Sequence, residues 1–199
     1  PPPGAVEALN AALILAADHD LSTSTLTARL AASFRADPYS VVTVGLSALG
    51  GVMQPVASLA TERLLADISD PEHAAWVIGD RLRQGQRLPG LGHALHPHGD
   101  PRAALLLGRL REVYAESPRL AVVEALLEAT RSRGIPGPNI DFALAALAHL
   151  AAMQRGSSEA IFGLARSAGW LAHAIEEYGH GSAIRPRAIY VGTPVGPER

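Results

Sequence analysis

Residues 141–154 read "DFALAALAHLAAMQ", and this long apolar stretch predicts an α-helix. Toward the C-terminus, "EAIFGLARSAGWLAHAIEEYG" (residues 159–179) predicts a second helix. Toward the N-terminus, apolar residues keep a helical spacing over residues 101–114 and 118–133. Because the same period continues on both sides, the chain is predicted to be all-α.

Further helices are expected nearer the N-terminus, at residues 6–18, 26–34, 40–51, 56–68 and 71–85. Hydroxyl side chains in the stretch 22–25 can cap one of them, and Asp70 precedes Pro71, which suits the first position of another. Residues 85–100 contain glycines and two prolines without any period, so they predict a loop. Only "AIYVG" (residues 188–192) reads as a strand.

The composition excludes several classes of protein. A hydrophobic content of 48% is enough for a core, and 18% charged residues with a net charge of -2 give no basic excess for nucleic acid or anionic membranes. The absence of cysteine excludes disulfides, thiolate metal sites and a cysteine nucleophile. All seventeen basic residues are arginine, which excludes a Schiff-base lysine and a P-loop lysine.

The segment "PPPGAVEAL" (residues 1–9) has no basic region of the kind that begins a signal peptide. No apolar run reaches the ~18 residues of a membrane span. We therefore expect a soluble, cytoplasmic protein with no membrane partner.

A dense polar cluster stands out in "GLGHALHPHGDPR" (residues 90–102), where His93, His96 and His98 fall within six positions. A metal site would need acidic or further histidine ligands around an open position. No Cys, Glu or additional matched ligand lies nearby, so we expect no metal here, and we expect His96 and His98 to be solvated loop residues. His93 lies in the glycine-rich part, where backbone can approach a ligand closely.

Two other polar residues admit more than one interpretation. Asp141 follows the turn "GIPGPN" and opens a helix, so from the residues alone it could be an N-cap. Arg166 lies among apolar residues, including Leu164 and Trp170, so we expect it to need a buried anionic partner.

Six segments in order resemble the successive signatures of the citrate synthase family. They are "DHDLSTSTLTARL" (18–30), "SALGG" (47–51), "PGLGHALHPHGDPR" (89–102), "PNIDFALAAL" (138–147), "ARSAGWLAHAIEE" (165–177) and "RPRAIYVG" (185–192). Each is weak alone, but their order and spacing over most of the chain make the resemblance specific.

The resemblance implies an almost wholly helical fold in which a small helical domain is inserted into a larger one. By match, residues 56–155 form the small domain, and residues 1–55 and 156–199 form the C-terminal portion of the large domain. The N-terminal half of the large domain has no counterpart here, so we expect a fragment, a truncated relative or one piece of a split enzyme. Family members are homodimers whose domains close over the substrate.

The resemblance also implies a reaction: condensation of an acyl-CoA, usually acetyl-CoA, with a 2-oxo acid, usually oxaloacetate, without a permanently bound cofactor. Asp141 matches the base that removes the methyl proton, and both this role and the N-cap are open to it. His93 matches the donor to the ketone oxygen.

The carboxylates of the 2-oxo acid need cationic groups, and bidentate arginine holds them best. His19, Arg102, Arg166 and Arg185 match the family's substrate-binding residues, with Arg185 reaching in from the partner subunit. The backbone of the family's CoA-contacting loop matches Pro89, Gly90, Leu91 and Gly92.

One catalytic position departs from the family pattern. Where the family has a histidine that donates to the thioester oxygen, this chain has Gln54, followed by Pro55 and Val56 in place of glycines. Gln can still donate, but loss of one good oxyanion donor typically costs ~3 kcal/mol. We therefore expect impaired enolisation.

Two alternatives to an active condensing enzyme follow from this departure. One is a non-catalytic module that binds a dicarboxylate or a CoA ester, or that regulates a full-length partner. The other is a half-enzyme completed by a separate chain that supplies the missing N-terminal half.

Overall fold

The computed structural model describes residues 1–50, 57–97 and 99–192, and within them the regular structure is helical. The elements are α1 (Ala5–Ala16), α2 (Thr23–Ser33), α3 (Pro38–Leu49), α4 (Ala57–Ala66), the 3₁₀ helix η1 (Pro71–His73), α5 (Ala74–Arg83), α6 (Pro101–Val113), α7 (Pro118–Arg131), α8 (Ile140–Leu150) and α9 (Ser157–Gly179). The expected all-α class is confirmed.

Local capping explains where several of these helices begin. The side chain of Ser22 accepts a hydrogen bond from the Thr25 amide at the start of α2, and Asp70 accepts one from the Glu72 amide before α5. Asp37 caps α3 in the same way, so this helix starts at Pro38, two residues before the apolar stretch that predicted it.

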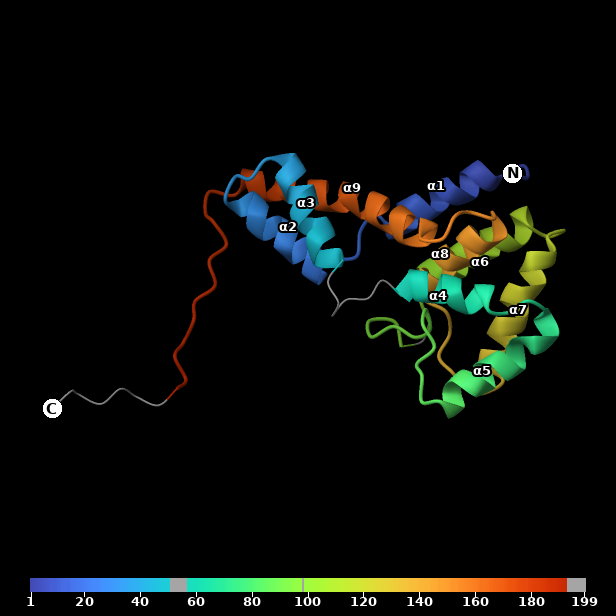
Figure 1. The fold of residues 1–199 in the computed structure, drawn as a ribbon. Coiled ribbons are helices and arrows are strands. Elements are labelled where there is room, and N and C mark those ends of the chain that lie inside the picture. Colours follow the sequence, from blue (N-terminus) through green and yellow to red (C-terminus); the bar gives the residue numbers. More distant parts are fainter. Residues whose placement is uncertain (51–56, 98, 193–199) are drawn as a thin grey trace.

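The predicted strand at residues 188–192 is wrong. This segment has no regular structure, and the only β-bridge outside a strand in the described part of the chain joins Leu91 to Pro138. Ile189, Tyr190 and Val191 are instead exposed on a segment that projects from the helices beyond α9 (Figure 1). A β-branched sequence does not form a strand without a neighbour to pair with.

The long helix α9 joins two apolar cores. Its first half packs with α1, α4 and α8, and Ile161 belongs to the larger core, which α5, α6 and α7 complete. Its second half carries Trp170 and Ala174 into a smaller core with α2 and α3. Figure 1 shows the two groups of helices at opposite ends of α9.

Helix α8 is the centre of the larger core, because seven consecutive residues, Phe142–Ala148, are buried there. The apolar stretch that predicted this helix is therefore covered on nearly every side. Helix α1 shares this core with α4–α8, and the division of the chain at residues 55/56 and 155/156 stays a prediction.

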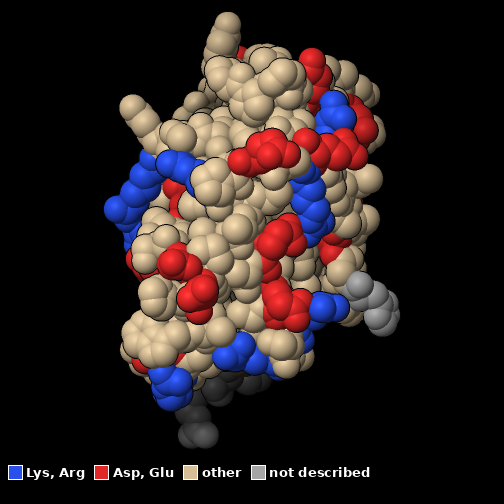
Figure 2. All heavy atoms as spheres, turned by 90° about the vertical axis from the view of Figure 1, so that its right-hand side faces the viewer, with Lys and Arg blue, Asp and Glu red and all other residues tan. Residues whose placement is uncertain are grey.

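The surface agrees with the near-neutral composition. On the face shown in Figure 2, acidic and basic side chains are intermixed, and neither sign forms a continuous patch. Among the described residues, no helix has both the length and the apolar character needed to cross a membrane.

Candidate active site

The loop that contains Pro89, Gly90, Leu91 and Gly92 is pressed against two helices. Gly90 and Gly92 have positive φ angles of 75° and 73°, which glycine adopts without strain. A Cβ atom on Gly90 would lie 2.6 Å from Oγ1 of Thr61 in α4 and 3.0 Å from Cβ of Phe142 in α8. Only glycine therefore allows this loop to lie so close to the start of α8.

Hydrogen bonds hold the same loop against the segment before α8. The Gly92 amide donates to the Gly137 carbonyl at 2.8 Å, and the Asn139 amide donates to the Gly90 carbonyl at 2.9 Å. The Asn139 side chain adds a third bond, from Nδ2 to the Gly92 carbonyl at 2.8 Å. The loop and the first turn of α8 are thus one connected unit.

Asn139 is also the N-cap of α8, so the N-cap interpretation of Asp141 is wrong. The Asn139 Oδ1 atom accepts the amides of Asp141 at 3.0 Å and Phe142 at 3.3 Å. The cap needs an extended residue just before the helix, and Asn139 has that conformation. The Asp141 carboxylate, in the first helical turn, is left available for another role.

The environment of Asp141 is that of a carboxylate prepared to accept a proton. Burial raises its pKa to about 6; the positive charge of Arg102 opposes this shift, and the negative charge of Asp100 adds to it. A carboxylate with such a pKa is ionised at neutral pH and is a stronger base than an exposed aspartate.

Arg102 is fixed by the buried carboxylate of Asp100. Its Nε atom donates to Oδ1 at 3.0 Å and its Nη2 atom donates to Oδ2 at 2.8 Å. The Oδ2 atom also accepts the Ile140 amide at 2.9 Å. Asp100 therefore joins the first turn of α6 to the first turn of α8 and fixes the guanidinium near Asp141.

Two histidines complete the cluster, and their hydrogen bonds define their tautomers. Arg102 can only donate, so Nδ1 of His19, 3.0 Å from its Nη1 atom, accepts. Nδ1 of His93 accepts the Leu95 amide at 3.2 Å. In neutral rings the proton then lies on Nε2 of each residue, and each ring is a hydrogen-bond donor there.

Both rings are neutral at physiological pH. Burial, and next the positive charge of Arg102, lower the pKa of His19 to about 4 and also lower the pKa of His93. The two ring centroids lie 5.1 Å apart in an edge-to-face arrangement. The cluster thus places two neutral donors beside a fixed guanidinium.

Arg166 enters the same region from α9 and is 1% exposed. Arg166 has an anionic partner, as expected, but the prediction that this partner is buried is wrong. Its ion pair is with Asp18 at 3.4 Å, and that side chain is 58% exposed. Hydroxyl groups of Thr25 and Ser22 and the Ala17 carbonyl accept its other hydrogen bonds, because the start of α2 and the segment before it face this part of α9.

The site residues described so far lie in the segments whose order suggested the resemblance. The family described as "Citrate synthase, C-terminal domain" matches residues 1–187. This chain belongs to the citrate synthase family. Its all-helical structure, with Asp141, His93, His19, Arg102 and Arg166 on the expected segments, is consistent with that membership.

Individual relatives support the assignment to the citrate synthase family. The chain is 36% identical over 195 residues to citrate synthase 2 of Bacillus subtilis, covering 96% of this chain and 52% of that protein. It is 31% identical over 183 residues to 2-methylcitrate synthase 1 of Corynebacterium glutamicum, covering 90% of this chain and 48% of that protein. The chain thus spans about half the length of the curated relatives it matches.

Solved structures of the citrate synthase family have the same fold. Citrate synthase from the thermophilic archaeon Thermoplasma acidophilum, in a ternary complex with carboxymethyl coenzyme A and oxaloacetate, gives a TM-score of 0.80 at 31% identity, over 98% of this chain and 54% of that one. Citryl-CoA lyase from Hydrogenobacter thermophilus gives a TM-score of 0.84 at 22% identity, over 100% of this chain and 81% of that one. At this level of identity the likeness is one of fold alone.

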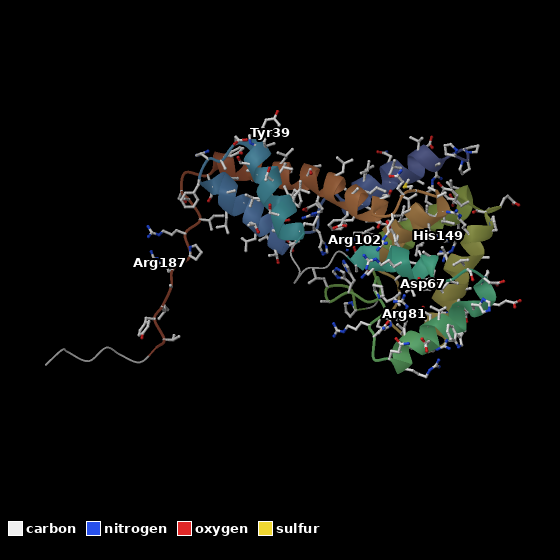
Figure 3. The ribbon with its side chains drawn as sticks, in the orientation of Figure 1. Tyr39, Asp67, Arg81, Arg102, His149 and Arg187 are labelled. Carbon is white, nitrogen blue, oxygen red and sulfur yellow. The ribbon has the colours of Figure 1, made fainter. Side chains whose placement is uncertain are left out.

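Of the expected site residues of this citrate synthase relative, one is not described and another lies away from the cluster. Gln54 lies outside the described residues. Arg185 is exposed in the segment beyond α9, and Figure 3 shows its neighbour Arg187 on that projecting segment, far from Arg102. Its role in the site of a partner subunit stays a prediction.

His96 is less exposed than the sequence predicted. His96 is partly buried, because its ring lies 4.9 Å from that of His93, whereas His98 is outside the described residues. In the part of the chain that the structure describes, no group of three or more His, Cys, Asp or Glu side chains is arranged to hold a metal ion.

Sequence reasoning missed three residues that hold the site together. Asp100 and Asn139 show only a capping signal in the sequence, yet they also fix Arg102 and the loop at Gly92. His173 accepts a hydrogen bond from Arg29 at Nδ1 and donates from Nε2 to Asp18 at 3.2 Å, which orients the ion-pair partner of Arg166. No local pattern indicated these contacts.

Proposed function

We propose that this chain carries the catalytic cluster of a citrate synthase-type enzyme that condenses acetyl-CoA with oxaloacetate. The observation that carries the proposal is the grouping of a base, Asp141, with two neutral donors and a guanidinium. A Claisen-type condensation needs a base for a weakly acidic C–H proton, donors for developing oxyanions and cations for the carboxylates. The cluster meets each requirement within one chain except the enolate donor.

Each proposed step uses an atom with a suitable environment. The Asp141 carboxylate takes a proton from the methyl carbon, and the C–H electron pair forms the enolate of the thioester. That carbon attacks the ketone carbon of oxaloacetate, Nε2–H of His93 hydrogen-bonds the oxyanion that forms, and a proton from solvent completes the hydroxyl group. Water then cleaves the thioester and releases the CoA thiol.

Binding of oxaloacetate is assigned to the cationic groups. Arg102 and Arg166, with Nε2–H of His19, hold its carboxylates, and Arg185 of a second copy completes the grip in a homodimer. The loop that contains Gly90 and Gly92 contacts CoA through its backbone. Carboxylate–guanidinium bonds are short and directional, so they also orient the ketone toward His93.

The test is release of thiol from acetyl-CoA in the presence of oxaloacetate, measured with the longest natural form of the protein. Asp141→Asn should lower kcat by roughly two or more orders of magnitude, because it removes the base while keeping the shape. In the wild type, activity should fall as pH decreases through about 6, as Asp141 becomes protonated. Unchanged turnover in Asp141→Asn would refute the assignment.

A second function, non-catalytic binding of a dicarboxylate or CoA ester, is favoured by Gln54. In the same assay, Gln54→His combined with Pro55→Gly and Val56→Gly should raise the rate if enolisation is the impaired step, and Gln54→His alone should raise it less. If neither wild type nor triple variant turns over while oxaloacetate still binds by calorimetry, the binding function is the correct one.

A further inference from the structure

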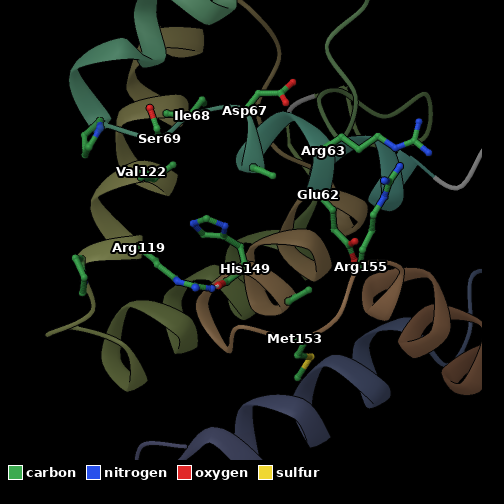
Figure 4. Close-up of a pocket in the computed structure, with 14 residues that line it drawn as sticks. Glu62, Arg63, Asp67, Ile68, Ser69, Arg119, Val122, His149, Met153 and Arg155 are labelled. Atoms are coloured by element: carbon green, nitrogen blue, oxygen red, sulfur yellow. Dashed lines mark hydrogen bonds between the residues drawn. The ribbon is translucent and has the colours of Figure 1, made fainter.

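A large pocket lies outside the candidate active site. It has a volume of about 710 Å³ and is bounded by α4, the segment before η1, the start of α7 and the end of α8 (Figure 4). Asp141 and His149 lie at opposite ends of α8, eight residues or about 12 Å apart along the helix axis. None of the proposed catalytic or substrate-binding residues that the structure describes lines this pocket.

The acidic residues of the pocket already have partners. Glu62 accepts the Gly156 amide at 2.7 Å and the Ser158 amide at 2.8 Å, so it neutralises the exposed amides at the start of α9. Asp67 accepts a hydrogen bond from Arg81 at 2.5 Å. Neither carboxylate is left to balance the arginines that line the same pocket.

Three arginines line the pocket without an acidic partner among the described residues. Arg119 donates from Nη1 to the His149 carbonyl at 2.7 Å, and that bond satisfies only one of its five N–H groups. The side chains of Arg63 and Arg155 have no hydrogen bond or ion pair with any described residue. In the view of Figure 4 the side chains of Arg63 and Arg155 lie on one side of the pocket, and Arg119 lies on the other side, beside His149.

One wall of the pocket has an unsatisfied polar atom. The Nε2 atom of His149 is buried and has no hydrogen-bond partner in the described structure. Such atoms are rare, since an unpaired buried polar group costs about 1–3 kcal/mol. A bound polar group that reaches this ring would offset the cost.

Apart from Ser69, the rest of the lining is apolar and includes Ile68, Val122 and Met153. A volume of this size is typical of pockets for small organic ligands. We propose that this pocket binds a small organic anion, a phosphate or carboxylate group attached to an apolar ring, at a site separate from the substrate site. The arginines bind the anionic group and the apolar wall covers the ring.

The test uses 1-naphthyl phosphate and 1-naphthoate as probes in calorimetric titrations of the whole protein, with naphthalene-1-methanol and inorganic phosphate as comparisons. At least one anionic probe should bind. Its Kd should rise at least about tenfold in Arg119→Gln and in Arg155→Gln, because each variant loses a charge-assisted hydrogen bond to the anionic group of the probe. The tighter of the two probes identifies the anionic group. Arg109→Gln, on the exposed face of α6, should leave the Kd unchanged.

Saturating oxaloacetate should not displace the probe, which separates this site from the proposed substrate site. Arg119→Gln removes a bond to the end of α8, so its fold is checked by thermal unfolding; Arg155→Gln breaks no described contact and keeps the test decisive. The proposal would be overturned if neither anionic probe binds, or if oxaloacetate displaces the bound probe. It would also be overturned if the neutral alcohol or inorganic phosphate binds equally well, or if Arg155→Gln leaves the Kd of the probe unchanged.

Discussion

Asp141 shows how one residue can serve chemistry at the expense of stability. Its pKa is raised from 3.8 to about 6, so the folded protein holds this proton more tightly than the unfolded chain. The stabilisation that this tighter proton binding gives the folded state is fully present below pH 3.8 and is lost as pH rises through about 6. At neutral pH the buried carboxylate therefore destabilises the fold by up to about 3 kcal/mol.

Asp141→Asn should raise the free energy of unfolding at pH 7.5, by at most about 3 kcal/mol, because the amide carries no charge to desolvate. The measurement is urea unfolding at pH 7.5 and at pH 4.5. The gain should shrink at pH 4.5, where the wild-type carboxyl group is protonated. A loss of stability at pH 7.5 would show that the carboxylate is favourably paired.

At the scale of the element, the site depends on how closely the loop at residues 89–92 approaches α8. The loop and helix are connected through Asn139, which caps α8 with Oδ1 and holds the Gly92 carbonyl with Nδ2. One side chain thus aligns the proposed CoA-contacting backbone with the turn that carries Asp141. Its two functions use different atoms, so they do not compete.

Gly90→Ala should destabilise the protein more than Gly85→Ala, although both positions have positive φ angles of 75° and 70°. Both changes carry the left-handed strain of an L-residue, about 1 kcal/mol. Only the new Cβ at position 90 meets Thr61 and Phe142, whereas nothing lies within 4 Å at position 85. Thermal unfolding gives the comparison, and equal losses in the two variants would mean that the loop can move away from α8.

At the scale of the whole molecule, the chain alone does not assemble all the proposed binding groups. Arg185 follows α9 on an exposed segment, while Arg102 and Arg166 lie in the cluster. A closed two-fold dimer can exchange such segments between identical sites. This geometry makes the predicted origin of Arg185 in the partner subunit testable by mixing variants.

Arg102→Leu and Arg185→Leu should each be nearly inactive alone in the thiol-release assay. After the two proteins are unfolded together and refolded, mixed dimers contain one site with both arginines intact, so about a quarter of wild-type activity should return. If Arg185 serves its own chain instead, every site in the mixture lacks one arginine. Absence of recovery in a folded mixed dimer would then contradict the exchange.

The sequence by itself determined most of the helices, two of their caps and the family. Ser22 and Asp70 act within two or three residues, where the chain holds the partners together whatever the rest of the molecule does. The resemblance also named His19, His93, Arg102 and Asp141, which the structure brings together, because each lies in a short segment with its own signature. The strand expected at residues 188–192 failed, since a strand needs a distant partner that the local pattern cannot supply.

Only the tertiary structure decided what each site residue does to the others. Asp100 and the Ile140 amide are 40 positions apart, and Arg102 and His19 are 83 apart. The tautomers of the histidines, the raised pKa of Asp141 and the exposed partner of Arg166 all follow from such contacts. Hydrogen bonds, burial and charge act over a few ångströms in space, so no spacing along the chain could reveal them.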